Sequence, residues 1–394
     1  MNQWWKEVAA VDRFFLAVNE IRPPFVIQLL LEGVGDPDPD ALDEALERAA
    51  AVNPGCTLKL VEEPDSEPRW VLGPVPTLTV LDEPNFEGHH GDDAPFLMWP
   101  IDCKTGPTCE LLLVRGKAGK CYLIFRAAHA VMDGQGTLLW VKDVLRALRG
   151  EHAIGHPSTA TVDQLIRDLD SPRRAYPKPD ALHPYAPGDP QAPPTFHWRR
   201  IVVNRPLDPL ASGRIAVALA ERARKGREGP VRINLPTDLR THNPEERTTG
   251  NYFNSLFLEV PPGATPDGMA LKIIQLLYKK EGTKSVGIYS ADEIGSLSAF
   301  RVKTFWDLNH LHDSGLYAFS ATLSHLGVLR GPELSGGGFT ATGGFFVPLV
   351  GDSGCVVSLN GFEEHTEAAV GLSARFTGQG QLEELAELIR RALE

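Results

Sequence analysis

Cysteine, basic residues and long apolar runs are all scarce in this chain. The 394 residues include five cysteines without a C-x-x-C pair, so we expect no disulfide framework or structural zinc site, and reduced, mostly buried thiols. Lys and Arg total 39 against 51 Asp and Glu, a net charge of −12, and no long basic run is present, which argues against nucleic acid as a partner. The sequence contains no uninterrupted apolar run of about 18 residues, the length that would predict a membrane-spanning helix. The opening MNQWWKEVAAVDRFF lacks the pattern of a signal peptide, so we expect a soluble, cytoplasmic protein.

The hydrophobic residues and their spacing predict a large α/β core. Hydrophobic residues make up 42% of the chain and charged residues 23%, and the length suggests two domains. In the first half, strand patterns at 25–31 and within 109–128 alternate with helical patterns at 42–49 and 138–148. Asp40 is the expected cap of the first of these helices. We therefore predict interleaved strands and helices.

Proline marks the expected boundary between the domains. The segment from about 156 to 196 is dense in proline, which disfavours helix interiors and central strands. We predict a first domain at 1–160, a linker at 161–196 and a second domain at 197–394. Within the second domain the expected helices lie near 210–224, 267–279 and 382–392, and the expected strands at 231–236, 254–260, 355–362 and 368–376. The Gly-rich stretch 336–346 lacks the lysine of a phosphate loop and is predicted to be a loop or strand-edge segment.

The stretch AAHAVMDGQG, residues 127–136, carries the most chemistry. It places His129 at the end of an apolar strand and Asp133-Gly134 four residues later, before an amphipathic helix. Burial there favours the neutral imidazole, which is then available as a base. Transfer of an acyl group from a thioester to an alcohol or amine needs such a base and no nucleophilic serine, because a thiolate leaves readily.

Asp133 has two possible partners in the sequence. It can orient His129 as in a catalytic triad, or it can pair with an arginine that locks the turn. We favour the arginine, because Arg240 ends the strand-like segment PTDLR in the second half and an Asp133–Arg240 pair would join the two halves at the site.

The motif alone is moderate evidence, because H-x-x-x-D-G arises by chance in about one in fifteen chains of this size. The alternative is that His129 is an ordinary core histidine whose hydrogen bonds are satisfied. Its position between a strand and a helix favours the functional interpretation.

At these residues the chain resembles the chloramphenicol acetyltransferase-like superfamily with the H-x-x-x-D-G motif. That group includes condensation domains of non-ribosomal peptide synthetases, BAHD acyltransferases, polyketide-associated acyltransferases and wax ester synthases. The segment AAVDRFFLAV is similar to the opening of free-standing members, INLPTDLRTHNPEERTTGNYFNSLFLEV to their arginine and Gly-Asn segment, and ATLSHLGVL to a strand that lines the site. The resemblance implies a pseudo-dimer of two α/β domains with the active site in a tunnel between them.

The same resemblance implies roles for individual residues. His129 is then the general base and Asp133 is structural together with Arg240, while Gly134 shapes the turn and lends a backbone N–H to the oxyanion. The Asn of the site-lining strand is replaced here by His325, so Ser324 or a neutral His325 is the expected donor. With Asn251 of the Gly-Asn pair, these are the predicted substrate-binding residues.

Departures from the family pattern narrow the reaction. Ala128 precedes His129 where condensation domains usually carry a second histidine, and Gln135-Gly136 follows Gly134 in place of serine. These changes weaken the interpretation as a peptide-bond-forming domain. The D-F-G-W-G motif of BAHD enzymes is absent from the sequence.

Other candidate residues have simpler explanations. His310 and His312 form an H-x-H pair that can hold a metal on one side of a strand, but the sequence offers no third ligand, so no metal is predicted. Two basic pairs, Arg173-Arg174 and Lys279-Lys280, can meet the phosphates of a pantetheine-bearing donor or simply be solvated surface.

The function predicted from sequence is therefore a free-standing acyltransferase. It moves an acyl group from a coenzyme A or carrier-protein (acyl-phosphopantetheine) thioester to a hydroxyl, or less favourably an amine, of a small-molecule acceptor, with no bound cofactor. Two alternatives stay open. One is a catalytically retired module that binds a carrier protein or partner enzyme, and the other is a cyclisation-type reaction that uses the same histidine.

Overall fold

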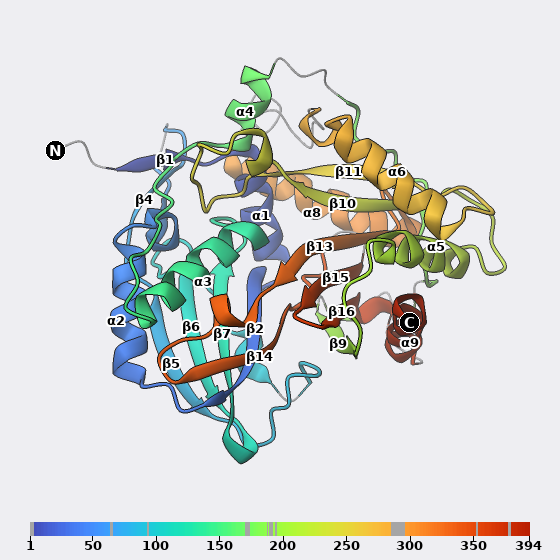
Figure 1. The fold of residues 1–394 in the computed structure, drawn as a ribbon. Coiled ribbons are helices and arrows are strands. Elements are labelled where there is room, and N and C mark those ends of the chain that lie inside the picture. The colour runs from blue at the N-terminus through green and yellow to red at the C-terminus, as the bar shows by residue number, and fades with distance from the viewer. Residues whose placement is uncertain are drawn as a thin grey trace.

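Two β-sheets organise the chain into two lobes (Figure 1). The computed structural model describes residues 4–394 apart from 64–65, 93, 170–173, 187, 189–191, 194, 285–295, 352–353 and 377–379, and apart from the side chains of 118, 306 and 308–313. One sheet has five strands and the other six. The fold is therefore the mixed α/β pseudo-dimer that the sequence predicted.

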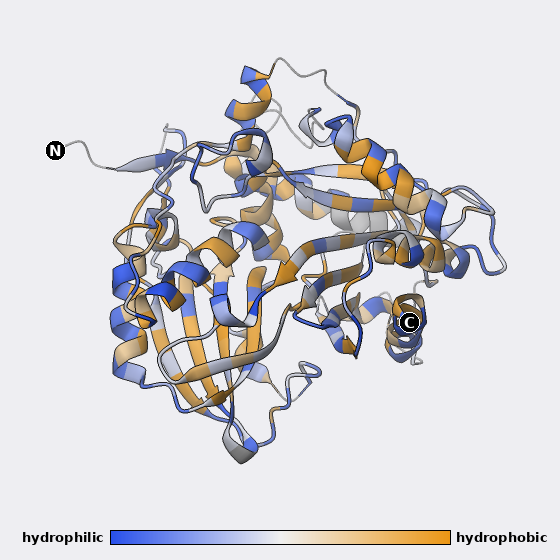
Figure 2. Ribbon diagram, viewed as in Figure 1, coloured by the Kyte–Doolittle hydropathy of each residue, from blue (hydrophilic) through white to orange (hydrophobic). Residues whose placement is uncertain are grey.

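The first sheet holds the strand that leads to His129. Its order is β14 (Phe339–Phe346), β2 (Val26–Gly35), β7 (Lys120–Ala128), β6 (Cys109–Arg115) and β5 (Thr77–Asp82). Every residue of β7 after Lys120 is buried, because alternate side chains enter two separate apolar clusters on the two faces of the sheet. Helices α2 (Pro39–Ala50) and α3 (Gly134–Leu148) cover one face, and Figure 2 shows the apolar strands beneath them.

The second sheet is built mainly from the second half of the chain. Its order is β11 (Phe253–Glu259), β10 (Arg232–Asp238), β13 (Ala321–Leu329), β15 (Cys355–Phe362), β16 (His365–Ser373) and β9 (Phe196–Val203). Helices α5 (Ala211–Ala223), α6 (Pro266–Tyr278) and α9 (Gln381–Leu393) cover one face through a single apolar cluster. Its other face is left to line a cavity.

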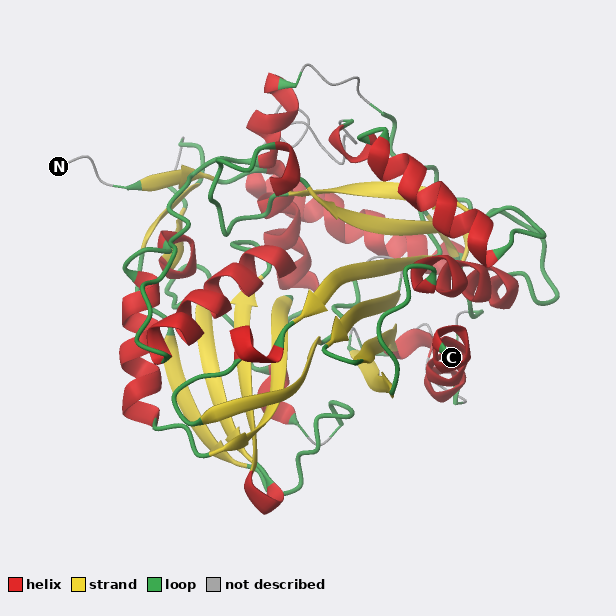
Figure 3. Cartoon of the chain, in the orientation of Figure 1, coloured by secondary structure: helices red, strands yellow, loops and turns green. Residues whose placement is uncertain are grey.

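Shorter elements complete the fold, and Figure 3 shows how much loop connects them. Helix α1 (Ala10–Ile21) packs against α8 (Leu297–Ser314). A three-stranded sheet has the order β1 (Trp5–Glu7), β4 (Arg69–Leu72), β3 (Leu58–Val61). Helix α4 (Val162–Asp168) and the pair β8 (Ala181–Leu182) and β12 (Leu316–Tyr317) are also present, so the proline-rich segment 161–196 contains a short helix and a two-residue strand.

Strand β14 crosses from the second half of the chain into the first sheet. It follows β13 and precedes β15, both in the second sheet, yet it pairs antiparallel with β2 from Phe339↔Gly35 to Phe346↔Leu29. The Gly-rich stretch 336–346 is thus an edge strand, one of the two states predicted for it. The boundaries 1–160, 161–196 and 197–394 remain a prediction, and this crossing is a feature that they do not anticipate.

Two local predictions were wrong. The side chain that caps α2 is Asp38, which accepts from the Asp40 amide, because Pro39 already takes the first helical position. Residues 310–312 lie on helix α8 rather than on a strand, and the side chains of His310 and His312 fall outside the described residues.

The structure also bears on the cysteines, on membrane spans and on metal sites. All five cysteines are buried, and none of them forms a disulfide. Within the described part of the chain, no helix is both long and apolar enough to cross a membrane. The described residues also contain no cluster of three or more His, Cys, Asp or Glu suited to a metal ion.

Candidate active site

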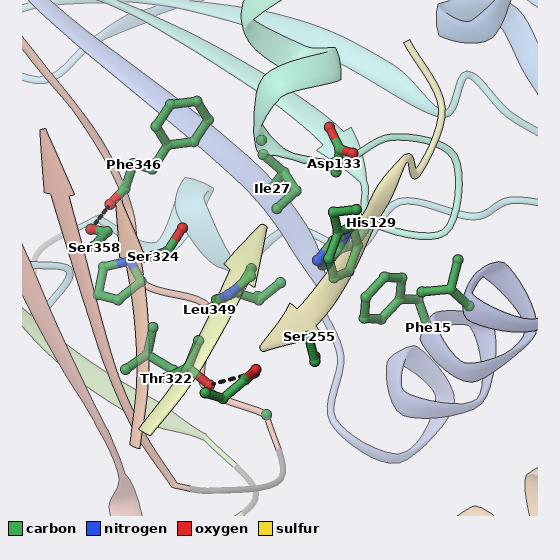
Figure 4. A pocket seen from close by; sticks show the side chains of 18 of the residues that line it. Phe15, Ile27, His129, Asp133, Ser255, Thr322, Ser324, Phe346, Leu349 and Ser358 are labelled. Atoms are coloured by element: carbon green, nitrogen blue, oxygen red, sulfur yellow. Dashed lines mark hydrogen bonds between the residues drawn. The ribbon is translucent and has the colours of Figure 1, made fainter. Parts of the chain in front are cut away.

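A cavity of about 230 Å³ lies between the two sheets. Its two walls differ in composition. Apolar side chains come from α1, from the start of β2 and the residue before it, and from the end of β14 and the segment after it: Val11, Phe14, Phe15, Val18, Phe25, Ile27, Phe346, Val347, Pro348 and Leu349. The second sheet supplies most of the polar side chains, Asn234, Asp238, Ser255, Thr322, Ser324 and Ser358, together with the apolar Pro236, Phe253, Leu326 and Val356. His129 lies where the two walls meet (Figure 4).

The fold holds His129 through its backbone and through aromatic rings. Its backbone N–H donates to the Phe25 carbonyl at 3.1 Å, which extends the β2–β7 pairing by one residue. Its imidazole stacks on Phe15, with 3.7 Å between ring centroids and 19° between planes. Phe25 stacks nearby at 5.6 Å. The ring is therefore fixed between apolar surfaces that disfavour its charged form.

The surroundings of His129 leave one ring nitrogen available as a base. Burial lowers the pKa of His129 to about 4, although the nearby Asp133 charge acts in the opposite direction. The Nδ1 atom lies 3.2 Å from the Met132 carbonyl oxygen. A carbonyl only accepts, so Nδ1 carries the proton in the neutral ring and Nε2 keeps a lone pair.

Asp133 is occupied by other groups and does not orient the imidazole. Its two carboxylate oxygens each accept from the Arg240 guanidinium at 3.1 Å, a bidentate pair between the two halves of the chain. The same oxygens accept from the backbone N–H of Gly136 at 2.6 Å and of Tyr252 at 2.8 Å. Asp133 thus caps α3 and fixes the turn after His129, and the structure contains the Asp133–Arg240 pair that the sequence favoured over a triad.

Asn251 stands behind His129 rather than in the cavity wall. Its Nδ2 donates to the His129 carbonyl and to Asp12 Oδ1, both at 2.8 Å. Asp12 is itself buried and accepts from the Trp70 indole at 3.2 Å. Asn251 is not among the residues that line the cavity, and its amide hydrogens support the backbone of the histidine. A role of Asn251 in binding substrate stays a prediction.

The two predicted residues of β13 point in different directions. Ser324 faces the cavity beside Thr322 and Leu326, as strand alternation requires. His325 borders the cavity, but it is exposed and its Nδ1 lies 3.2 Å from Ser212 Oγ at the start of α5, on the other side of the sheet. The role of His325 as an oxyanion donor stays a prediction.

The start of α3 offers donors in place of His325. Gly134 and Gln135 line the cavity and begin α3, so their amides have no carbonyl of a preceding helical turn to bind. The positive end of the helix dipole reinforces them toward developing negative charge. A side chain at Gly134 would come within 3.1 Å of Leu326 Cδ2, so glycine keeps this approach open.

Sequence reasoning missed most of the apolar wall. Phe14 and Phe15 come from α1, and Leu349 comes from the connection after the crossing strand. The apolar face of α1 is visible in VDRFFLAV, but nothing local shows that it meets residue 129. Of the two basic pairs, Arg173 lies outside the described residues, Arg174 pairs with Glu281, and Lys279 and Lys280 are exposed.

Comparison with solved structures identifies the fold, although no family model and no curated protein sequence matches the chain. A mutant starter condensation domain of rhizomide synthetase, in complex with C8-CoA and Leu-SNAC, superposes with a TM-score of 0.69 at 15% identity, over 99% of this chain and 94% of that one. The first condensation domain of the calcium-dependent antibiotic synthetase, bound to a substrate analogue, gives 0.67 at 16% identity, over 99% and 95%. The chain therefore shares, over 99% of its length, the fold of these condensation domains, which agrees with the fold that the sequence resemblance implied.

Proposed function

We propose that this protein transfers an acyl group from a coenzyme A or carrier-protein thioester to a hydroxyl, or less favourably an amine, of a small-molecule acceptor, with His129 as general base. The observation that carries the proposal is the position of His129, whose Nδ1 faces the Met132 carbonyl while the ring borders a cavity between the lobes. The solved neighbour with C8-CoA bound shows that this fold accommodates an acyl thioester.

The proposed reaction uses the site in two steps. Nε2 of His129 takes the acceptor proton as the acceptor oxygen or nitrogen attacks the thioester carbonyl carbon. The amides of Gly134 and Gln135 donate to the oxyanion of the tetrahedral intermediate. The C–S bond then breaks, and the thiolate leaves with the proton that His129 has held. No side chain is acylated, because the thiolate leaving group makes a covalent intermediate unnecessary.

The polarity of the walls supports an apolar acyl group. Phe14, Phe15, Phe25 and Leu349 offer it an apolar surface, and among the described residues that line the cavity no Lys or Arg is present to recognise a carboxylate. The acceptor is proposed to reach Nε2 with its hydroxyl or amine toward the polar residues of the second sheet.

The test is thiol release from a panel of acyl-coenzyme A and acyl-pantetheine donors, with mixed alcohols and amines and with product mass measured. We expect acceptor-dependent release that falls by about 10²–10⁴-fold in His129→Ala, the usual contribution of a positioned base. His152→Ala is the matched control, because His152 is exposed and is not among the residues that line the cavity.

Three results would contradict the proposal. Equal thiol release by wild type and His129→Ala would show that His129 takes no part in the chemistry. A product that has lost water without joining two substrates would indicate cyclisation instead, and no product from any donor would favour a module that only binds its partner.

A further inference from the structure

The second sheet lines the cavity with rows of side chains at increasing distance from His129. On β10 the lining residues are Asn234, Pro236 and Asp238, which alternate along the strand and therefore share one face. Asp238 pairs in register with Phe253, whose ring centroid lies 6.3 Å from that of His129. Asn234 precedes Asp238 by four residues of strand, a distance of about 13 Å. The cavity thus extends well beyond the reacting atoms along β10.

Asn234 lies in the row farthest from the histidine, where the surroundings are largely aromatic. Its neighbours in the sheet are Phe257 on β11 and Thr322 on β13. The ring of Phe257 contacts those of Phe319 and Tyr176, with centroids 5.8 Å and 5.6 Å apart, and these two aromatic residues also line the cavity. A ligand that reaches this row therefore meets the Asn234 amide within an apolar environment.

One end of the Asn234 amide is left for a ligand. The residue is 8% exposed, and its Nδ2 donates to Thr322 Oγ1 at 3.4 Å, whereas its Oδ1 has no partner among the described residues. A buried carbonyl without a hydrogen-bond donor is costly, so a ligand that donates to it is favoured over one that cannot. Burial also disfavours a charged ammonium group, so the fitting group on the ligand is neutral, a hydroxyl or an amide N–H.

We propose that Asn234 selects the acceptor molecule by accepting a hydrogen bond from a second, neutral polar group on it, remote from the hydroxyl or amine that attacks the thioester. This inference rests on the proposed acyl transfer and narrows its acceptor to elongated molecules with polar groups at both ends. Ser255, paired with Pro236, and Ser324 line the cavity between these ends and offer a polar path (Figure 4). A saturated acyl chain has no hydrogen bond to donate and suits the apolar wall from α1 and β2.

The test compares the dissociation constants of three ligands of matched chain length by calorimetry: a 1-alkanol, the α,ω-diol and the ω-methoxy alcohol. At the far end only the diol can donate a hydrogen bond, and chains of about six to ten carbons bracket the distance along β10. We expect the wild type to prefer the diol to both other ligands. Asn234→Leu should prefer the alkanol, with a change of about tenfold in the ratio of the diol and alkanol dissociation constants.

The variants are chosen so that loss of folding is not mistaken for loss of recognition. Asn234→Leu removes an unpaired buried carbonyl at similar size, so it should keep or raise Tm. Gln275→Leu is the control, because it also replaces an amide with leucine, yet Gln275 is exposed on α6 and is not among the residues that line the cavity. Its ratio should equal that of the wild type. The comparison of diol with methoxy alcohol needs the wild type alone.

Several outcomes would overturn the inference. They are equal wild-type affinities for the diol and the methoxy alcohol, no measurable binding of any of the three ligands, and an unchanged ratio in folded Asn234→Leu. Selection of an ω-hydroxyacyl-coenzyme A over the plain acyl-coenzyme A, without selection among the acceptors, would place the recognised group on the acyl chain instead. His129-dependent thiol release with simple alcohols would still support acyl transfer in each case, so the two proposals fail separately.

Discussion

At the residue scale, the neighbours of His129 determine its protonation and its position. Phe15 and Phe25 remove water from the ring, Met132 fixes which nitrogen carries the proton, and Asn251 holds the backbone carbonyl. None of these neighbours supplies the negative charge that a triad carboxylate would, because both oxygens of Asp133 are taken by Arg240 and backbone amides. The site thus favours a neutral base over a charge-assisted one.

This environment predicts an unusual pH profile. Burial lowers the pKa of His129 to about 4, so the imidazole stays neutral well below the ordinary histidine value of 6.5. At pH 5.5 such a group is still almost wholly able to accept a proton, whereas an ordinary histidine is about nine-tenths protonated. We expect kcat/KM for thiol release to stay level from pH 8 to about 5 and to fall only as the pH approaches 4. Circular dichroism at each pH is the control for folding, and a full inflection between pH 6 and 7 would contradict this assignment.

At the element scale, the local order around His129 was predictable and the distant contacts were not. A strand that runs into His129 and a helix over 138–148 follow from side-chain periodicity, whereas the start of the helix at Gly134, capped by Asp133, was not predicted. Arg240 was found because it ends a strand-like segment in the other half. The crossing of β14, the approach of α1 and the support of Asn251 by Asp12 depend on contacts between residues more than a hundred positions apart, which no local pattern records.

The orientation of β13 is a second feature that the sequence alone did not predict. The sequence placed Ser324 and His325 together in the site, but neighbouring strand residues face opposite sides. Which side faces the cavity is decided by α5, whose Ser212 meets His325 and whose apolar residues pack with Leu323.

The first turn of α3 also makes a testable packing contact. A Cβ on Gly136 would lie 1.9 Å from the Thr249 carbonyl oxygen, in the loop that Arg240 holds. Alanine normally stabilises a helix relative to glycine by about 1 kcal/mol. We expect the reverse here: Gly136→Ala should lower the free energy of unfolding by about 2–3 kcal/mol and reduce thiol release, because the loop must move.

Chemical denaturation measures this effect, and Gly268→Ala is its control. Gly268 also lies in the first turn of a helix, α6, but a Cβ there meets only the Thr265 hydroxyl at 3.0 Å. If the two variants have the same stability, the contact between α3 and the Thr249 loop is looser than the structure indicates.

At the scale of the whole molecule, the two lobes are joined by chain and by charge. Strand β14 takes residues of the second half into the first sheet, and the Asp133–Arg240 pair joins the lobes at the site. On another side of the molecule, Arg200 of β9 bridges Glu32 of β2 at 2.5 Å and Glu367 of β16 at 2.7 Å. The cavity therefore lies between lobes that are fixed to each other at separate points.

Arg200 provides the test of this arrangement. Its side chain is 3% exposed and that of Glu367 is 0% exposed, so Arg200→Ala would leave a fully buried carboxylate with only His365 and the Gly344 amide as partners. Breaking a buried pair on one side costs about 3–5 kcal/mol. We expect a loss of that size in the free energy of unfolding at pH 7, measured by denaturant titration. Arg199→Ala is the matched control, because the neighbouring Arg199 is 26% exposed and pairs with exposed Asp92 and Glu383, so about 1 kcal/mol or less should be lost.

The pH dependence of the loss separates a buried charge from lost packing. In the wild type, the pKa of Glu367 lies below its ordinary value: burial raises it, but His365 and Arg200 together lower it by more. Without Arg200, burial dominates and the folded-state pKa should rise above the unfolded one. Below that raised pKa, Glu367 of the folded variant binds a proton, so the variant regains stability. In the wild type, the ionised Glu367 stabilises the fold, and this contribution to the free energy of unfolding is lost as the pH falls. The gap between wild type and Arg200→Ala should therefore narrow from pH 7 to pH 5, and a gap that stays constant would show that Arg200 acts through packing on Phe345 rather than through its charge.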